Sequence, residues 1–302
     1  MRDVIITVVV VSYNAEKTIK ETLESIKEQT YKNIELIVSD DCSSDKTVEL
    51  ANKWMNDNRT RFVRSKLLTV DHNTGTTSNL NRALRECSGI WLKDIAADDI
   101  LLPNCIESCM NKVNSNPEIS WIMGKSLKFR DIIDEKHLIN EDDYFSDEKL
   151  NDVQGEIEVQ KKAIVKYNFI DAPSVFIKIQ IIRESGGYDE RYKLLEDWPM
   201  WKKLLYNGYK CYFLNEYIVG YRANANSVSN NTTKMFNIDY QASVFSFEKN
   251  ELFKYNSFSY IVNKRLHHSL CIIFEKLNLN NRRYFNRKSY NFLYKLIDLI
   301  FK

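Results

Sequence analysis

The sequence of 302 residues has little glycine and little proline, 8 and 4 residues respectively. This composition excludes collagen-like and low-complexity chains, and 44% hydrophobic residues is ordinary for a globular core. No stretch reaches the roughly 18 uninterrupted apolar residues of a membrane-spanning helix. The apolar run through Val11 is followed at once by polar Ser12-Tyr13-Asn14, which predicts a first strand and not a signal peptide. We therefore expect a cytoplasmic globular protein.

The cysteines and histidines lack the spacing of a metal site. The six cysteines form no Cys-x-x-Cys pair, and the four histidines show no ligand spacing. We expect reduced, mostly buried thiols and assign the histidines no catalytic role. The positions are Cys42, Cys87, Cys105, Cys109, Cys211 and Cys271, with His72, His137, His267 and His268.

Charge is distributed unevenly along the chain. The whole chain has a net charge of +2, whereas ten lysines and arginines face two acids between Lys254 and Lys302. This tail therefore carries +8, and the first 253 residues carry −6. A helix from about Tyr284 would place apolar residues on one side, namely Leu293, Leu296, Ile297 and Ile300.

The basic, aromatic tail has two interpretations. We favour peripheral contact with anionic lipid at the inner face of a membrane, and the alternative is packing on the catalytic domain or on a second subunit of a homodimer. Nucleic acid would suit the same charge, but no nucleic-acid-binding motif is present, so we expect no nucleic-acid partner.

Strands and helices alternate over the first 123 residues. This order predicts a mostly parallel sheet with right-handed crossovers. After the first strand, Asn14 is expected to cap a helix with Ile19, Leu23 and Ile26 on one face. Further strands are expected at 34–38, 62–68, 90–97 and 119–123, and helices at 47–55, 76–86 and 103–114.

The alternation breaks down after residue 123. Residues 131–152 are rich in acids and predict a mobile loop over one face, with a solvated excursion as the alternative. Helical character returns near 156–167 and 197–207, and strands are expected at 172–177, 211–214 and 217–221. From about residue 233 onward the sequence predicts helices. We expect a catalytic domain over 1–225, in a nucleotide half (1–123) and an acceptor half (124–225), and a helical region over 226–302.

Three acidic pairs stand at strand ends or helix starts: Asp40-Asp41, Asp98-Asp99 and Glu196-Asp197. Ligands of open α/β sheets bind beyond the carboxyl ends of the strands, so these side chains can converge on one cleft. A diphosphate cannot sit against bare carboxylates, which predicts Mn²⁺ or Mg²⁺ between them. The third pair would supply a general base. Each pair has a structural alternative, because Asp is common in turns and at helix caps.

Seven motifs follow one another in order: Ser12-Tyr13-Asn14, residues 40–45 (DDCSSD), Asn73-Thr74-Gly75, Gly89, Asp98-Asp99, Gly187-Tyr188-Asp189-Glu190 and Glu196-Asp197-Trp198. In this order they resemble family 2 of the inverting, nucleotide-sugar-dependent glycosyltransferases. The resemblance covers roughly residues 4–222. It implies an α/β GT-A fold, Rossmann-like, with a helical C-terminal extension in this chain.

The resemblance also implies roles for individual residues. Asp41 would hydrogen-bond the uracil of a UDP-sugar, with Ser12, Tyr13 and Asn14 beside it. Asp98 would lie near the ribose and donor sugar and share the metal with Asp99, which holds it on the diphosphate. Asp197, with Glu196 beside it, would deprotonate the acceptor hydroxyl.

Two positions depart from the family pattern. Many relatives carry a further acid where this chain has Ala96, so the metal role falls on Asp98 and Asp99 alone. A histidine common near the end of the domain is replaced by Asn224. Arg222 beside it could meet the diphosphate, because guanidinium suits phosphate geometry, and a structural surface role is the alternative.

These residues predict transfer of a hexose from a UDP-sugar, with Mn²⁺ or Mg²⁺, to a glycan or lipid-linked oligosaccharide of a bacterial surface polysaccharide such as capsule or O-antigen. The alternatives are a nucleotidyltransferase, which would release pyrophosphate, and a non-catalytic module that binds sugar or nucleotide at a membrane. The sugar, the linkage and the oligomeric state do not follow from the sequence.

Overall fold

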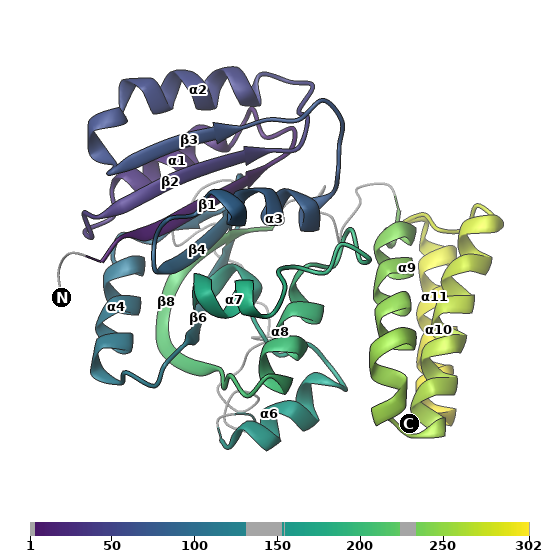
Figure 1. Cartoon of the computed structure of the whole chain (residues 1–302). Coiled ribbons are helices and arrows are strands. Elements are labelled where there is room, and N and C mark those ends of the chain that lie inside the picture. The colour runs from purple at the N-terminus through teal and green to yellow at the C-terminus, as the bar shows by residue number, and fades with distance from the viewer. Residues whose placement is uncertain (1–3, 131–152, 154, 224–233, 302) are drawn as a thin grey trace. The chain divides into compact units, whose positions relative to one another are not determined.

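The computed structural model describes residues 4–130, 153, 155–223 and 234–301 (Figure 1). The chain divides into two compact units, one of residues 1–190 with 196–222 and one of residues 191–195 with 223–302. The predicted loop at 131–152, the boundary at 225/226 and Asn224 lie outside the described residues.

The first unit is built on an eight-stranded sheet in the order β3-β2-β1-β4-β7-β6-β8-β5 (Figure 1). Its first four strands are parallel: β1 Ile6–Ser12, β2 Ile34–Asp40, β3 Arg64–Leu68 and β4 Trp91–Ala96. The other four strands of the same sheet run in mixed directions: β5 Ile100–Leu101, β6 Trp121–Phe129, β7 Val175–Lys178 and β8 Tyr212–Arg222. Strand β7 runs antiparallel to β4 and β6, and β8 runs parallel to β6 and antiparallel to β5.

Helices flank this sheet, which confirms the predicted α/β fold. One apolar cluster joins alternate residues of β1, β2 and β4 to α1 Ile19–Lys27, α2 Thr47–Asp57 and α4 Cys105–Ser115. Helix α3 Thr76–Glu86 packs against β1 and β2, with buried residues that lie outside that cluster. Further along are α6 Ile157–Ile164, α7 Ile179–Glu184 and α8 Asp197–Tyr206, and Trp201 of α8 stacks on Trp121 of β6.

Three sequence predictions are wrong in detail. Asn14 is not a helix cap, because α1 begins at Ile19 with Thr18 at the N-cap and Asn14 has a φ of 50° in the preceding turn. The strands expected at 211–214 and 217–221 are a single strand, since β8 pairs with β6 across an irregularity in register. Helix α7 was not anticipated, because six residues are too few to show a helical period.

Gly89 explains why one motif needs glycine. A Cβ atom at this position would lie 2.7 Å from the carbonyl oxygen of Ile5 and 2.7 Å from Oγ1 of Thr7. The Gly89 amide also donates a hydrogen bond to that Oγ1 at 3.0 Å. The close approach of backbone to β1 fixes where β4 starts, and therefore where its acidic end lies.

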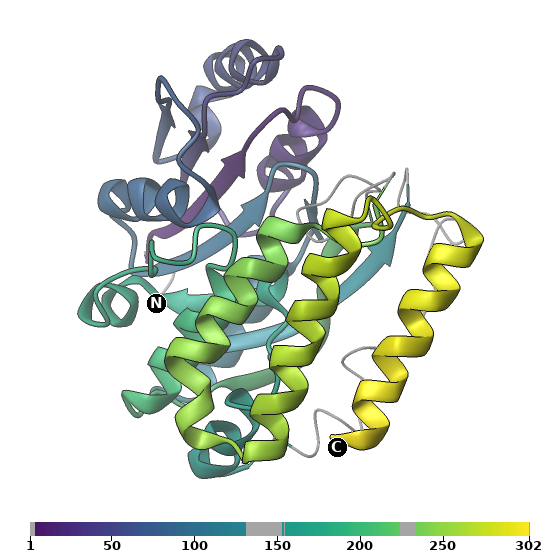
Figure 2. The same cartoon turned by 90° about the vertical axis from the view of Figure 1, so that its right-hand side faces the viewer.

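The second unit contains three helices side by side, with α10 between the other two (Figure 2). They are α9 Ile238–Phe247, α10 Phe258–Lys276 and α11 Tyr284–Ile300, with the short helices η3 Glu248–Leu252 and η4 Phe253–Tyr255 between α9 and α10. The side chains of Asn237 and Ser257 cap α9 and α10. Across the described residues, each helix is too short or too polar to cross a bilayer.

Candidate active site

The ends of three neighbouring strands bring the predicted motifs together. In the parallel register Ser12 at the end of β1 pairs with Asp40 at the end of β2, and Val11 pairs with Ala96 of β4. The chain stays in register just beyond the strands, because the Asp41 amide donates to the Ser12 carbonyl at 2.9 Å. Carboxyl ends of parallel strands meet at one edge of a sheet, so the first two acidic pairs share that edge.

Ser12 and Asn14 organise the turn after β2. The Ser12 hydroxyl donates to Oδ2 of Asp40 at 2.8 Å. Oδ1 of Asn14 accepts the amide of Ser44 at 2.9 Å, and the Asn14 amide donates to the hydroxyl of Ser43 at 2.8 Å. Tyr13 between them is 54% exposed. Of these three predicted donor-binding residues, Ser12 and Asn14 have structural partners, and Tyr13 presents its ring to solvent.

Asp41 is buried and fully engaged by neighbouring residues. Its Oδ2 accepts the amides of Thr74 (2.9 Å) and Gly75 (2.7 Å), and its Oδ1 accepts the Thr74 hydroxyl and Nη2 of Arg82 (2.9 Å). The Asn73-Thr74-Gly75 motif therefore closes over this carboxylate. Arg82 on α3 was not anticipated, because no local sequence signal distinguishes it from a surface arginine.

Asp98 and Asp99 follow β4 and are held by Arg222 at the end of β8. Asp99 is 2% exposed, and its Oδ1 accepts the Arg222 amide at 2.8 Å. Nε of Arg222 donates to the backbone carbonyl of Asp98, also at 2.8 Å. Burial, together with the adjacent charge of Asp98, raises the pKa of Asp99 well above its usual range. Two adjacent, partly desolvated carboxylates are a place where a cation would be stabilised.

The donor set at this point fits Mg²⁺ or Mn²⁺ bound jointly with a substrate. The part of the chain that the structure describes has no cluster of three or more acidic, histidine or cysteine side chains that could hold a metal. Mg²⁺ is commonly held by one or two carboxylates together with substrate phosphates, which two aspartates can provide. Among the described residues, the second side-chain oxygen of Asp99 has no hydrogen-bond partner. The residues present therefore suit a metal that arrives with a diphosphate.

Arg222 is buried and its guanidinium has protein partners. It forms an ion pair with Glu21 of α1 and lies over the ring of Phe129 at 4.5 Å from the centroid. A contact between Arg222 and a diphosphate stays a prediction. In this structure Arg222 positions Asp98 and Asp99.

Two charged residues near this edge, the buried Lys93 and the partly buried Asp171, were not anticipated from the sequence. Lys93 is completely buried, and its Nζ donates to the backbone carbonyls of Asp94 and Pro173, the latter at 2.7 Å. Burial raises the pKa of Asp171, whose Oδ2 is buried without a hydrogen bond among the described residues. A lone lysine inside the apolar run of β4 is a signal that could have identified the first of them.

The third acidic pair stands at the start of α8. Glu196 is the N-cap residue and Asp197 the first residue of the helix, so the expected cap role of Asp197 falls one residue earlier. Nδ2 of Asn168 donates to Oδ2 of Asp197 at 2.8 Å. Burial raises the pKa of Asp197, and burial followed by the charge of Asp197 raises the pKa of Glu196 to about 8. Asn168 was not anticipated as the residue that orients this acid.

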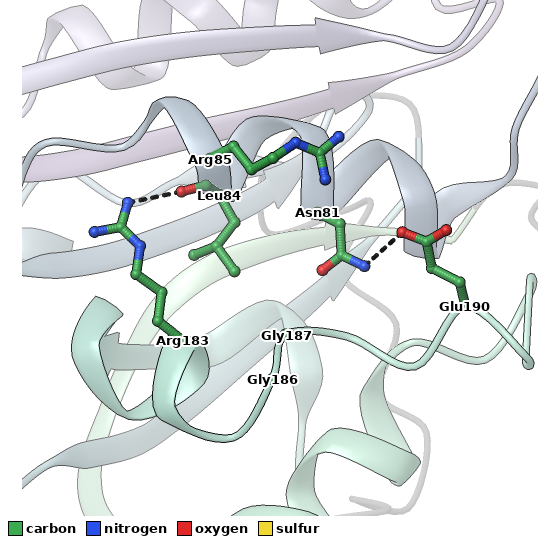
Figure 3. Close-up of a pocket in the computed structure, with 7 residues that line it drawn as sticks. All are labelled: Asn81, Leu84, Arg85, Arg183, Gly186, Gly187 and Glu190. Atoms are coloured by element: carbon green, nitrogen blue, oxygen red, sulfur yellow. Dashed lines mark hydrogen bonds between the residues drawn. The ribbon is translucent and has the colours of Figure 1, made fainter.

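The Gly187-Tyr188-Asp189-Glu190 motif is fastened to α3 by Asn81 (Figure 3). Nδ2 of Asn81 donates to the Tyr188 carbonyl (2.9 Å) and to Oε1 of Glu190 (2.8 Å), and its Oδ1 accepts the Tyr188 amide (2.9 Å). Gly187 has a φ of 76° and lies so close to Asn81 that a Cβ atom would be 2.9 Å from Oδ1. The segment that leads to Glu196 is thereby tied to the nucleotide half.

A pocket of about 340 Å³ lies beside Asn81 and Glu190 (Figure 3). Its lining residues are Asn81, Leu84, Arg85, Arg183, Gly186, Gly187 and Glu190. Nη2 of Arg183 donates to the carbonyls of Leu84 and Cys87, which makes it a structural residue. The described lining includes no residue from the three acidic pairs, so we do not assign this pocket as the donor site.

Stability should depend on pH through Glu196. Between pH 4.5, its ordinary pKa, and about 8, the folded protein retains a proton that the unfolded chain releases, so stability falls as pH rises through this window. Glu196→Gln removes the titration and should raise the free energy of unfolding at pH 8 by about 4 kcal/mol relative to wild type, with a smaller gain at pH 5. Urea unfolding at both pH values measures the difference. The exposed Glu49→Gln is the matched control, and an equal gain there would contradict the assignment.

Comparisons with known proteins agree with the glycosyltransferase resemblance of the sequence motifs. Residues 7–138 match the family model "Glycosyl transferase family 2". An uncharacterized glycosyltransferase of Methanocaldococcus jannaschii is 28% identical over 232 residues, which cover 72% of this chain and 70% of the relative. WfgD of Escherichia coli, a UDP-Glc:alpha-D-GlcNAc-diphosphoundecaprenol beta-1,3-glucosyltransferase, is 35% identical over 124 residues, or 41% of this chain and 46% of WfgD.

Solved structures share the fold at low sequence identity. S. aureus TarS 1-349 in complex with UDP-GlcNAc has a TM-score of 0.62 at 16% identity and covers 87% of this chain and 71% of its own. A mannosyltransferase from Pyrobaculum calidifontis, in complex with GDP-Man and Mn²⁺, has a TM-score of 0.57 at 15% identity and covers 97% and 69%. The topology of the sheet, the acids at the strand ends and the family match all indicate a glycosyltransferase. Residues 7–138 therefore match glycosyl transferase family 2, and the chain is a glycosyltransferase with a GT-A fold.

Proposed function

We propose that this glycosyltransferase moves a hexose from a UDP-sugar to a hydroxyl of a glycan or lipid-linked oligosaccharide, with inversion, in the synthesis of a surface polysaccharide. One observation carries the proposal: the acids at the ends of β2 and β4 share one edge of the sheet, and a separate acidic pair with raised pKa values stands at the start of α8. The first group suits a charged leaving group and the second suits proton removal.

On the donor side we assign the base contact to Tyr13 and Asp41. The exposed ring of Tyr13 could stack on uracil, and Asp41 would accept its N–H once Arg82 or the Thr74 hydroxyl has moved away. The name of WfgD and the ligand of the TarS complex support a UDP-sugar. The GDP-Man complex of the Pyrobaculum enzyme makes a guanine nucleotide the comparison to include in a test.

Asp98 and Asp99 would hold a divalent metal on the diphosphate. When bound, this metal neutralises the charge that develops on the leaving UDP. Arg222 fixes the Asp99 carboxylate through its backbone amide and the Asp98 backbone through Nε, so the two acids are preorganised before substrate binds. With Ala96 in place of a further acid, the protein supplies two carboxylates, and the phosphates supply the other charged ligands.

On the acceptor side we assign Asp197 as the general base. Asn168 holds one of its oxygens, which orients the carboxylate. Burial, followed by the charge of Asp197, raises the pKa of Glu196 to about 8, so Glu196 retains its proton near neutral pH and we assign the role of the ionised base to Asp197. An ionised Asp197 takes the proton of the acceptor hydroxyl as the oxygen attacks the anomeric carbon, and a single displacement inverts that carbon.

Calorimetric titration tests the donor assignment most directly. We expect UDP to bind to the full chain with Mn²⁺ present and to bind at least about tenfold more weakly without it, because two adjacent carboxylates repel a bare diphosphate. GDP under the same conditions is the matched ligand and should bind more weakly than UDP. Tighter binding of GDP would overturn the UDP-sugar assignment, and metal-independent binding would overturn the role of Asp98 and Asp99.

The location at the inner face of a membrane and the formation of a homodimer stay predictions.

A further inference from the structure

Exposed apolar side chains gather in the second unit. Twenty large hydrophobic side chains are exposed among the described residues, and thirteen of them lie between residues 255 and 300. Scattered exposed apolar residues are normal, but a concentration of them marks a surface that another molecule covers.

Helix α11 uses one face to pack against α10. Tyr290 lies with its ring centroid 5.2 Å from that of Phe274, and its hydroxyl is 3.3 Å from Sγ of Cys271. Asp298 accepts a hydrogen bond from Nδ2 of Asn263 at 3.0 Å and pairs with His267 at 2.8 Å. The single acidic residue of α11 therefore faces α10.

The opposite face of α11 is apolar and exposed. Phe285, Phe292 and Leu299 follow one another at intervals of seven residues, so they form one row along the helix, and they are 79%, 66% and 79% exposed. Leu296 and Ile300 lie beside this row and are exposed as well. In Figure 2 α11 stands at the edge of the three helices, with α10 on one side only. We call these five residues the outer stripe.

Cations run beside the outer stripe. Lys288 and Lys295 follow Phe285 and Phe292 by three residues, which makes each lysine a neighbour of a stripe residue on the helix surface. Arg283 and Arg287 stand at the start of the helix. The described part of the chain gives Arg283, Arg287 and Lys295 no acidic partner. The exposed face of α11 is thus apolar with a positive margin.

We propose that the outer stripe docks the protein on an anionic lipid bilayer, with α11 lying in the interface. Apolar side chains would enter the boundary between headgroups and acyl chains, while Lys288 and Lys295 would reach the lipid phosphates. The positive charge beside the outer stripe favours anionic lipid over a second copy of this chain, because two such faces in contact would place cations beside cations. The proposal does not depend on which sugar is transferred.

Sedimentation of the full chain with vesicles tests the proposal. We expect binding to phosphatidylcholine vesicles that contain phosphatidylglycerol, weaker binding to phosphatidylcholine alone, and loss of the difference at high salt. The triple variant Phe285→Ser, Phe292→Ser, Leu299→Ser should bind anionic vesicles at least about tenfold more weakly. The double variant Lys288→Glu, Lys295→Glu should lose about tenfold on anionic vesicles only. Tyr217→Ser, at an exposed aromatic of the other unit, is the matched control.

The readouts separate this proposal from the proposed function. UDP binding by each variant shows that the catalytic unit is folded and should match wild type. Equal vesicle binding by wild type and the triple variant overturns the docking role of the outer stripe. Absence of wild-type binding to anionic vesicles overturns it too, and a dimer that the triple variant abolishes would assign the stripe to a second copy of the chain.

Discussion

Replacement of Asp197 with asparagine should lower kcat by about 10³-fold, because a positioned general base contributes about 10² to 10⁴ to a rate. The substitution keeps an oxygen for the hydrogen bond from Asn168 and removes the charge that takes the acceptor proton. Affinity for UDP should not change, since Asp197 acts on the acceptor. Steady-state transfer from a UDP-sugar, measured together with UDP titration, separates the two effects.

Glu196→Gln is the matched comparison for Asp197, because it makes the same change one residue earlier. Glu196 retains its proton near neutral pH, so this variant should lose about tenfold or less in kcat. The rate of the wild-type enzyme should rise with pH as the pair ionises, and this acidic limb should disappear in Asp197→Asn. A larger loss in Glu196→Gln than in Asp197→Asn would exchange the roles of the two acids.

Replacement of Asp99 with asparagine should weaken UDP binding in the presence of Mn²⁺ by about 100-fold. Loss of an outer-shell partner of a metal typically costs 10 to 100-fold in affinity, and a direct ligand should cost at least as much as the upper value. The asparagine oxygen can still accept the Arg222 amide, so the turn after β4 should keep its geometry. Without metal, the variant should bind UDP as well as wild type or slightly better, because one repulsive charge is gone.

Asp171→Asn is the control that separates metal binding from general electrostatics. Asp171 is a partly buried acid near Asp99, and its substitution removes an acidic group from the same neighbourhood. We expect its metal-dependent affinity for UDP to stay within about threefold of wild type, since long-range charge effects are weaker than direct coordination. A loss in Asp171→Asn as large as that in Asp99→Asn would contradict a ligand role that is specific to Asp99.

The sequence predicted that the first two acidic pairs lie at one edge of the sheet, because the signals involved are local. Each acidic motif follows an apolar run, and parallel strands end at the same edge, so the neighbourhood of Asp41 and Asp99 follows from the order of elements. Helix α3 was expected at 76–86 and has these bounds, because its apolar residues recur at helical spacing.

The contacts of these acids could not be predicted from patterns along the chain. Asp41 is saturated by Thr74, Gly75 and Arg82, residues 33 to 41 positions away. Arg222 reaches Glu21 across 201 residues. Such partners depend on how β8 and α3 pack on the sheet, and side-chain periodicity carries no information about them.

The alternating α/β order, the acids at the strand ends and the basic, apolar character of the last helix follow from local patterns, since each depends on residues a few positions apart. The antiparallel insertion of β7 between β4 and β6, the burial of Lys93 and the hydrogen bond between Asp99 and the end of β8 depend on contacts between distant segments. The physical reason is that hydrophobic periodicity fixes which face of an element is buried. Which other element covers that face, and which charges meet there, is set by packing between segments far apart in the chain.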